Sequence, residues 1–266
     1  MIVWALFDSG NGCYTQGAEL FNQLVNQSVK IYPIGIDIEC KNNHFINLNL
    51  ADYGRMFGDN KLFDELDKLP KPDLIIASPP CESWSVASAM WGGNASWKQE
   101  TGAVNRELSK FTVRSRADYD LPHFQFKYDR SFLNRINGEL CIYNTIEIIK
   151  RYQPKVYVIG NPTSSKIWHY VNDILNFQIP FDNLAHYNLY NYPLRKPTRF
   201  KSNINLGLRN NHKSKPQQQW EDFSKSYNER SNIPLELIVD IYKAVNQYLT
   251  NPIGVPVSAF FLGERK

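Results

Sequence analysis

A cysteine at the end of a predicted strand is the side chain best placed for covalent chemistry. Residues 73–77 are mostly aliphatic and predict a short buried strand, which Ser78, Pro79, Pro80 and Cys81 follow. Two consecutive prolines fix two φ angles and remove two N–H donors, so the loop aims Cys81 in one direction. Ligands of open α/β sheets sit outside the carboxyl ends of the strands. We therefore expect Cys81 to be a nucleophile rather than a small buried hydrophobe.

A glycine turn near the start of the chain predicts a ligand loop. Residues 2–7 are apolar and predict a buried first strand, residues 8–12 predict a turn, and residues 16–26 have apolar side chains at helical spacing. Strand, glycine turn and helix in this order are typical of the entry to a Rossmann-like nucleotide fold. Glycines in such a turn let the backbone approach a ligand where a Cβ atom would collide.

An acidic residue follows the second predicted strand. That strand covers residues 31–36, and Asp37 comes directly after it. A carboxylate at this distance from a glycine turn commonly accepts hydrogen bonds from ribose hydroxyl groups. We therefore expect Asp37 to bind a ribose and Ile38 to pack on an adenine face, with Glu39 as the alternative ribose ligand.

Two polar residues follow the third predicted strand. Residues 45–48 predict that strand, and Asn49 or Asp52 beyond it would receive an adenine amino group. Residues 59–69 then predict an amphipathic helix that returns the chain to the strand before Cys81.

Strands and helices alternate again in the second half of the chain. A helix is predicted from residue 139 to 153, a strand over 156–159, and a helix over 167–177. Gly160, Asn161 and Pro162 close the strand. A last helix is predicted after Ile233 and Pro234, where residues 237–249 have apolar side chains on one face. This order of elements predicts an α/β fold with a mostly parallel sheet and helices on both faces.

Two basic segments interrupt the alternation. Residues 90–138 carry eight Lys and Arg against five acids, with interleaved aromatic side chains. An irregular loop is predicted over residues 187–199, and a strand over 204–208. The overlapping segment 195–215 contains seven Lys and Arg residues and no acid. Such surfaces suit contact with nucleic-acid phosphates. A solvated lid is the alternative for the first segment, and a solubilising face for the second.

Composition sets broader limits. The 266 residues suffice for one large α/β domain with an insertion, and 42% hydrophobic residues permit a sizeable core. The net charge of +4 is compatible with nucleic acid as a partner. The four cysteines lack metal-ligand spacing, and there is no signal peptide or long apolar run. These features predict a cytoplasmic protein with reduced thiols and without membrane attachment.

Together, these motifs resemble those of the compact, phage-type DNA cytosine-5 methyltransferases. Ser-Pro-Pro-Cys with the following Trp-Ser resembles the family's catalytic loop, and the turn from Phe7 to Gly12 resembles the loop that cradles S-adenosylmethionine. Asn161 and Pro162 match the family's Glu-Asn-Pro strand end. Arg-Lys-Pro-Thr-Arg at 195–199 resembles a segment whose arginines contact the cytosine carbonyl and a phosphate. The likeness runs in order from Ile2 to about Leu249.

The resemblance implies a Rossmann-like, S-adenosylmethionine-dependent methyltransferase fold in a single domain over residues 1–266. It implies double-stranded DNA as partner, no metal, and a reduced target-recognition region, so that DNA contacts fall to residues 90–138 and 194–219. The implied site residues are, as catalytic groups, Cys81 and Arg199; for the substrate, Pro80, Ser85, Asn161, Pro162, Arg195 and Lys196; and for the cofactor, Phe7, Asp8, Ser9, Gly10, Gly12, Asp37, Ile38, Asn49, Asp52 and Pro79.

In the chemistry that the resemblance implies, a Cys81 thiolate attacks C6 of a flipped-out cytosine and makes C5 able to take a methyl group. Arg195 or Arg199 would supply the positive charge that the thiolate needs. Gly160 stands where the family has a glutamate that binds ring N3, which implies a slow or inactive enzyme. An amino-methyltransferase is one alternative, although Cys81 replaces the aromatic residue of its Ser/Asp-Pro-Pro-aromatic motif. A catalytically inactive DNA-binding protein on the same fold is the other.

Overall fold

A computed structural model gives the fold of the chain. It describes residues 1–25, 28–36, 44–85, 96–99, 111–114, 118, 120–121, 124–125, 128–219, 222–223 and 226–251. Asp37, Ile38, Glu39 and most of the predicted insertion 90–138 therefore lie outside the described residues.

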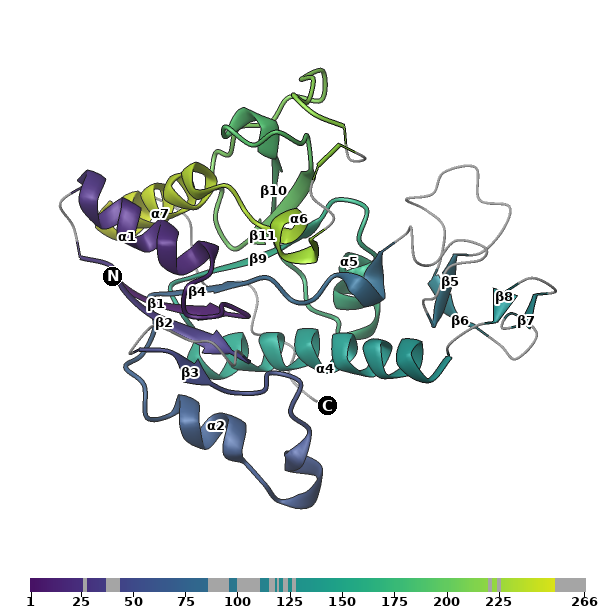
Figure 1. Ribbon diagram of the computed structural model, residues 1–266. Coiled ribbons are helices and arrows are strands. Elements are labelled where there is room, and N and C mark those ends of the chain that lie inside the picture. The colour runs from purple at the N-terminus through teal and green to yellow at the C-terminus, as the bar shows by residue number, and fades with distance from the viewer. Residues whose placement is uncertain are drawn as a thin grey trace.

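The fold is built on a seven-stranded mixed sheet in the order β10-β11-β9-β4-β1-β2-β3 (Figure 1). Strands β3, β2, β1, β4 and β9 run parallel, whereas β11 runs antiparallel to both β9 and β10. The prediction of an α/β fold with a mostly parallel sheet is confirmed. The strands are β1 (Ile2–Leu6), β2 (Lys30–Gly35), β3 (Ile46–Asn47), β4 (Leu74–Ala77), β9 (Val156–Pro162), β10 (Phe181–His186) and β11 (Pro197–Ser202).

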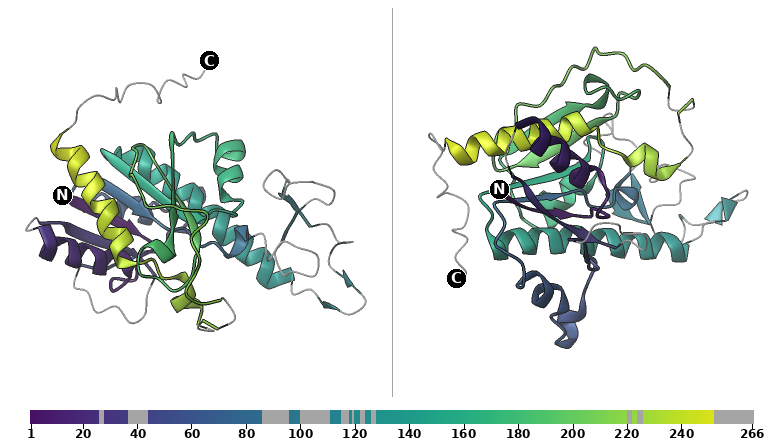
Figure 2. Two further views of the ribbon diagram at one scale, coloured as in Figure 1. Left: turned by 90° about the horizontal axis from the view of Figure 1, so that it is seen from above. Right: turned by 60° about the vertical axis from the view of Figure 1, so that its left-hand side comes forward.

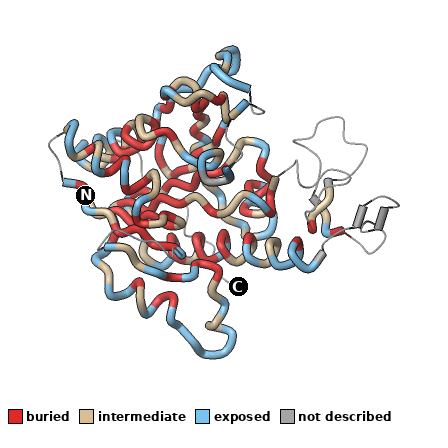
Figure 3. The backbone as a smooth tube through the Cα atoms, in the orientation of Figure 1, coloured by how far each residue is buried: buried red, intermediate tan, exposed pale blue. Residues whose placement is uncertain are grey.

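Helices cover both faces of the sheet (Figures 1 and 2). Helices α1 (Cys13–Val25) and α7 (Leu235–Thr250) lie side by side on one face, and α2 (Lys61–Leu66) and α4 (Tyr128–Tyr152) lie on the other. Successive side chains of a strand point to opposite faces, so β1 contributes Val3 and Ala5 to the core under α1 and α7. Its residues Trp4 and Leu6 enter the core under α2 and α4. The sheet is thus buried from both sides, as Figure 3 shows.

The close approach of α1 and α7 depends on a glycine. A Cβ atom at Gly17 would lie 2.3 Å from Cγ2 of Ile238, so only glycine permits this helix contact. Helix α7 begins directly after Pro234, as predicted, and buries Leu237, Ile241 and Val245 on one face.

The shorter elements complete the fold. Two small antiparallel hairpins, β5 (Trp97–Gln99) with β6 (Phe111–Val113) and β7 (Asp120–Leu121) with β8 (Phe124–Gln125), occur within the predicted insertion. The remaining helices of the described residues are the short α5 (Ile167–His169) and α6 (Tyr227–Ser231), a π-helical turn η4 (Tyr170–Ile174), and the 3₁₀ turns η1 (Gly54–Phe57), η2 (Glu82–Trp84) and η5 (Tyr187–Leu189). Among the described residues, no helix is long and apolar enough to cross a membrane.

Three boundaries differ from the sequence-based expectations. Helix α4 begins at Tyr128, inside the predicted insertion, and not at residue 139. The helix expected over 167–177 is the short α5 continued by the π-helical turn. The strand predicted over 204–208 is wrong: the antiparallel hairpin is made by β10 and β11 instead. Strand β11 was hidden because basic residues alternate with its buried Thr198, Phe200 and Ser202, so the segment looked like a charged loop.

Candidate functional site

The glycine turn after β1 is held by a buried carboxylate. The Asp8 carboxylate accepts the N–H groups of Gly10 at 2.8 Å and Tyr14 at 3.1 Å and the Thr15 hydroxyl at 3.1 Å. A carboxylate at the start of a helix satisfies N–H groups that have no partner inside the helix, and it complements the helix dipole. The side chain of Asp8, expected to contact a cofactor, is instead turned inward and shapes the turn.

The backbone of this turn is unusual. Phe7 has a φ of 65° and Gly10 a φ of 85°, so the chain enters the turn and passes its middle in the left-handed region. A Cβ atom at Gly12 would lie 2.8 Å from an Asp8 carboxylate oxygen, which explains the glycine there. The Ser9 hydroxyl lies 2.8 Å from the Asn11 amide oxygen. The expected ligand loop is therefore formed by tightly folded backbone, with Asp8 as its inner support.

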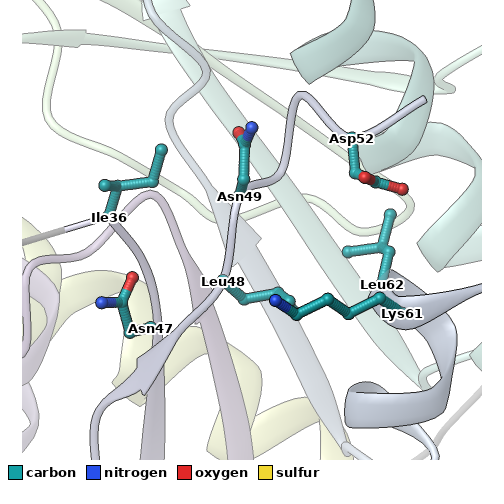
Figure 4. Close-up of a pocket in the computed structure, with 7 residues that line it drawn as sticks. All are labelled: Ile36, Asn47, Leu48, Asn49, Asp52, Lys61 and Leu62. Carbon is teal, nitrogen blue, oxygen red and sulfur yellow. The ribbon is translucent and has the colours of Figure 1, made fainter. Parts of the chain in front are cut away.

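A first cavity, of about 310 Å³, opens beside the ends of β2 and β3. Asn49 and Asp52, expected near an adenine, both line it, and Figure 4 shows Ile36 and Asn49 on neighbouring segments of the chain. The Ile36 side chain is 67% exposed, so an apolar surface is available there. The lining residues are Ile36, Asn47, Leu48, Asn49, Asp52, Lys61 and Leu62.

A buried asparagine of α4, which sequence reasoning missed, supports this cavity. The Asn144 amide donates to the backbone carbonyls of Leu50 at 2.8 Å and Asp52 at 2.7 Å, and its oxygen accepts from the Arg55 guanidinium at 3.0 Å. Asn144 is fully buried. It thereby fixes the segment that carries Asn49 and Asp52. A polar residue among the apolar residues of a helix was the signal that could have revealed it.

A second cavity, of about 110 Å³, lies at the ends of β4 and β9. The two strands are parallel neighbours, so the loops that follow them meet at one edge of the sheet. The cavity gathers Pro79, Pro80, Cys81, Asn161, Pro162 and Lys196 from the expected site residues. Its full lining is Ser78, Pro79, Pro80, Cys81, Gly160, Asn161, Pro162, Tyr187, Lys196, Thr198, Ser231 and Ile233.

Asn161 links the two loops of this second cavity. Its amide nitrogen donates to the Pro79 carbonyl at 2.9 Å, so β9 supports the loop that carries Cys81. The residue is 3% exposed, and its side-chain oxygen has no hydrogen-bond partner among the described residues. A buried acceptor without a partner is costly. A ligand amino group that entered the cavity would satisfy it.

Lys196 brings a partly buried positive charge into the same cavity. Its ammonium group donates to the Arg230 carbonyl at 2.8 Å and lies 5.2 Å from the centre of the Tyr187 ring. Burial lowers the pKa of Lys196, while Coulombic attraction to Cys81 and Cys13 opposes that shift.

The two arginines expected beside Cys81 do not line its cavity. Arg199 alternates with the cavity residue Thr198 along β11 and forms an ion pair with Asp182 at 3.3 Å. The charge of Arg195 contributes to lowering the pKa of His186, after the larger effect of burial. Of the three basic site residues Arg195, Lys196 and Arg199, only Lys196 therefore lines the cavity of Cys81.

An aromatic cluster anchors the turn that follows Cys81. Trp84 is 1% exposed and stacks on Trp97 with ring centres 5.9 Å apart, and it also contacts Tyr170. Turn η2 approaches α4 so closely that a Cβ atom at Gly138 would lie 2.6 Å from the Ser83 hydroxyl oxygen. Ser85, expected to bind substrate, ends this turn and lines neither cavity.

Gly160 occupies a more restricted position than the sequence indicated. It lies inside β9 and pairs directly with Phe200 of β11. A Cβ atom at Gly160 would lie 2.9 Å from Cε1 of the fully buried Phe200 ring and 3.2 Å from the Ser78 hydroxyl oxygen. The strand was expected over 156–159, with Gly160, Asn161 and Pro162 closing it. That boundary is corrected: β9 continues to Pro162, and the Phe200 ring fills the space beside Gly160.

The structure is thus an α/β protein with two cavities at the carboxyl ends of its parallel strands. The turn after β1 and the Cys81 loop after β4 flank the point where the strand order reverses, which is where such sheets bind ligands. Neither a scan against protein-family models nor a search of curated proteins found a match to this chain.

Proposed function

We propose that this protein is an S-adenosylmethionine-dependent DNA methyltransferase that acts on C5 of cytosine through Cys81. The second cavity carries the proposal, because it joins the Pro-Pro-Cys loop, the Asn161-Pro162 strand end and the partly buried cation Lys196 at the carboxyl ends of β4 and β9. A thiol, an unpartnered buried acceptor and a cation suit a polar heterocycle that a nucleophile attacks.

The first cavity supports S-adenosylmethionine as the second substrate. Asn49 and Asp52 offer polar atoms beside the exposed apolar side chain of Ile36, a combination that suits an adenine ring and its amino group. The turn from Phe7 to Gly12 would lie beneath the rest of the cofactor. When bound, S-adenosylmethionine supplies an activated methyl group.

The residues of the second cavity have separate tasks in this mechanism. The Cys81 thiolate forms a bond to C6 of the base, and the electron pair of the C5–C6 double bond moves into the ring. C5 thereby becomes nucleophilic; after methylation, loss of the C5 proton restores the double bond and expels the thiolate. The Asn161 oxygen would accept a hydrogen bond from the cytosine amino group. The base must first leave the duplex, at a cost of a few kcal/mol.

Trapping of the covalent adduct tests this proposal directly. DNA that contains 5-fluorocytosine should become attached to the protein in the presence of S-adenosylmethionine, because fluorine at C5 cannot leave as a proton. Cys81→Ser should abolish the adduct, whereas Cys141→Ser, which alters a buried thiol of α4, should retain it. An adduct that survives Cys81→Ser would reject Cys81 as the nucleophile.

Mapping of a labelled methyl group separates the remaining candidates. Label at C5 of cytosine supports the proposal, and label on an exocyclic amino group would identify an amino-methyltransferase. DNA binding without either label would identify an inactive DNA-binding protein, which is the outcome that the filled space at Gly160 favours.

A further inference from the structure

We propose that the Lys196 ammonium group is the counter-ion of the Cys81 thiolate. The purpose of this pair rests on the proposed function, because a thiolate is the form of cysteine that attacks a base. The existence of the pair does not rest on it, since the reactivity of a thiol is measured without DNA or cofactor.

The Cys81 loop cannot stabilise a negative charge with its own preceding backbone. Pro79 and Pro80 have no N–H groups, so the two peptide nitrogens before Cys81 offer no donors. The carbonyl of Pro79 is itself an acceptor, already bonded to Asn161. A full positive charge beside a Cys81 thiolate has to come from another element that faces the cavity, because the loop itself carries no Lys or Arg from Ser78 to Ser85.

Lys196 is held where it can provide that charge. It comes directly before β11, and its ammonium group is fixed by the Arg230 carbonyl on one side and the Tyr187 ring on another. An ammonium group has three N–H donors, and the Arg230 carbonyl uses one of them. Lys196 and Cys81 line the same cavity and interact electrostatically. Both residues are partly buried, and partial removal from water strengthens the attraction between their charges.

The other ionisable groups around the cavity do not replace Lys196. Cys13 also interacts electrostatically with Lys196, and burial raises its pKa. The Tyr14 hydroxyl is bonded to Ser78 at 2.5 Å, and burial raises the pKa values of Tyr14 and Tyr187. The Asp8 carboxylate is occupied within its turn.

Glu82 follows Cys81 directly and is exposed, and a carboxylate would repel a thiolate. Among the described residues that line this cavity, Lys196 is thus the cation that can stabilise Cys81.

The pH dependence of Cys81 alkylation tests the pair. Wild-type protein is treated with iodoacetamide over a range of pH, and the label at Cys81 is quantified by peptide mass spectrometry. Lys196→Gln keeps a donor for the Arg230 carbonyl but removes the charge. It should move the midpoint of the Cys81 profile upward by about one pH unit or more and slow alkylation at neutral pH about tenfold. Lys196→Arg should restore most of the reactivity.

Lys201→Gln is the matched control, because Lys201 is a half-buried cation of β11 that packs over Trp168 and does not line the cavity. It should leave the Cys81 profile unchanged. If Lys196→Gln does not fold, ultraviolet titration of wild type against Cys81→Ser gives the Cys81 midpoint by itself. A midpoint well below the ordinary value of about 8.5 supports the inference.

An ordinary midpoint in the wild type, or a profile that Lys196→Gln does not move, overturns the pairing. Failure of the proposed function is a separate result: alkylation would then shift as expected, while 5-fluorocytosine DNA would form no adduct.

Discussion

At the scale of single residues, the contact between Gly160 and Phe200 decides what the site can do. The proposed chemistry would gain from a carboxyl group beside N3 of the base, and the resembling family places a glutamate where this chain has Gly160. The Phe200 ring, however, lies across the place where any side chain at 160 would begin. The loss of the carboxyl group is therefore coupled to the packing of β9 against β11.

This coupling predicts how substitutions at Gly160 behave. Gly160→Ala should lower the free energy of unfolding by about 1–3 kcal/mol through overpacking, as measured by urea denaturation. Gly160→Glu should be at least as destabilising and should not raise the methylation rate by itself. Adding Gly160→Glu to Phe200→Val, which makes room, should raise the rate at least about tenfold over Phe200→Val alone.

Gly160→Gln with Phe200→Val is the control, because it has nearly the same shape and no acidic proton to share. Equal rates for the Glu and Gln double variants would show that no acid is missing from this position.

At the scale of elements, α4 connects the core to the first cavity through Asn144. Asn144→Leu removes the donor to two carbonyls and the acceptor for Arg55. We expect it to destabilise the fold by about 1–3 kcal/mol and to weaken calorimetric binding of S-adenosylhomocysteine about tenfold. Thr145→Val is the matched control, since this buried neighbour bonds only within α4, to the Cys141 carbonyl. If both variants bind S-adenosylhomocysteine with equal affinity, Asn144 does not support ligand binding in the first cavity.

Asp73 joins the amino ends of β1, β4 and β9, and its contacts predict that the stability of the fold depends on pH. Its carboxylate accepts the Ile2 N–H at 2.9 Å and pairs with Lys155 at 3.1 Å. Burial opposes ionisation, but the hydrogen bonds to Ile2 and Lys155 outweigh it and lower the pKa of Asp73. Because the folded pKa lies below the unfolded one, the stabilisation is complete above the unfolded value of about 3.9 and is lost as pH falls through the folded value.

Asp73→Asn should therefore cost about 1–2 kcal/mol of unfolding free energy at pH 7. The difference from the wild type should shrink as the pH falls below about 4. Urea denaturation at a series of pH values measures both. A difference that stays constant into acid would assign the effect to shape rather than to charge.

The sequence predicted those strands and helices that a local pattern of residues determines. The parallel strands β1, β2, β4 and β9 and the helices α1 and α7 follow from apolar runs, glycine turns and Ile233-Pro234. The two alternatives for the adenine site, Asn49 and Asp52, line one cavity, and the strand end that the resemblance put beside the Cys81 loop lines the other. Sequence did not reveal β10, because its pairing with β11 depends on residues distant in the chain. The role of Lys196 was missed for the same reason, since Arg230 and Tyr187 fix its ammonium group.

At the scale of the whole molecule, several basic residues of segment 194–219, expected to contact DNA, have partners within the protein instead. Within the described part of the chain, Arg199 pairs with Asp182, Arg209 pairs with Asp240, and Lys196 lines the second cavity. Lys213 and Lys215 remain exposed. Their segment is attached beside the second cavity, because Asn188, which follows the cavity residue Tyr187, donates to the Lys215 carbonyl at 3.1 Å.

These two lysines therefore provide the last prediction, which concerns DNA binding. Each phosphate contact releases a counterion, so the slope of log K against log salt should flatten by about 0.9 for each lysine replaced by glutamine. Lys71→Gln is the control. Lys71 is also exposed, but it precedes β4 and therefore lies at the opposite end of this strand from Cys81. Fluorescence anisotropy over a range of salt concentrations measures the slope for the wild type and for each of the three variants. If Lys213→Gln and Lys215→Gln leave the slope as unchanged as Lys71→Gln does, DNA does not approach the Cys81 cavity over this segment.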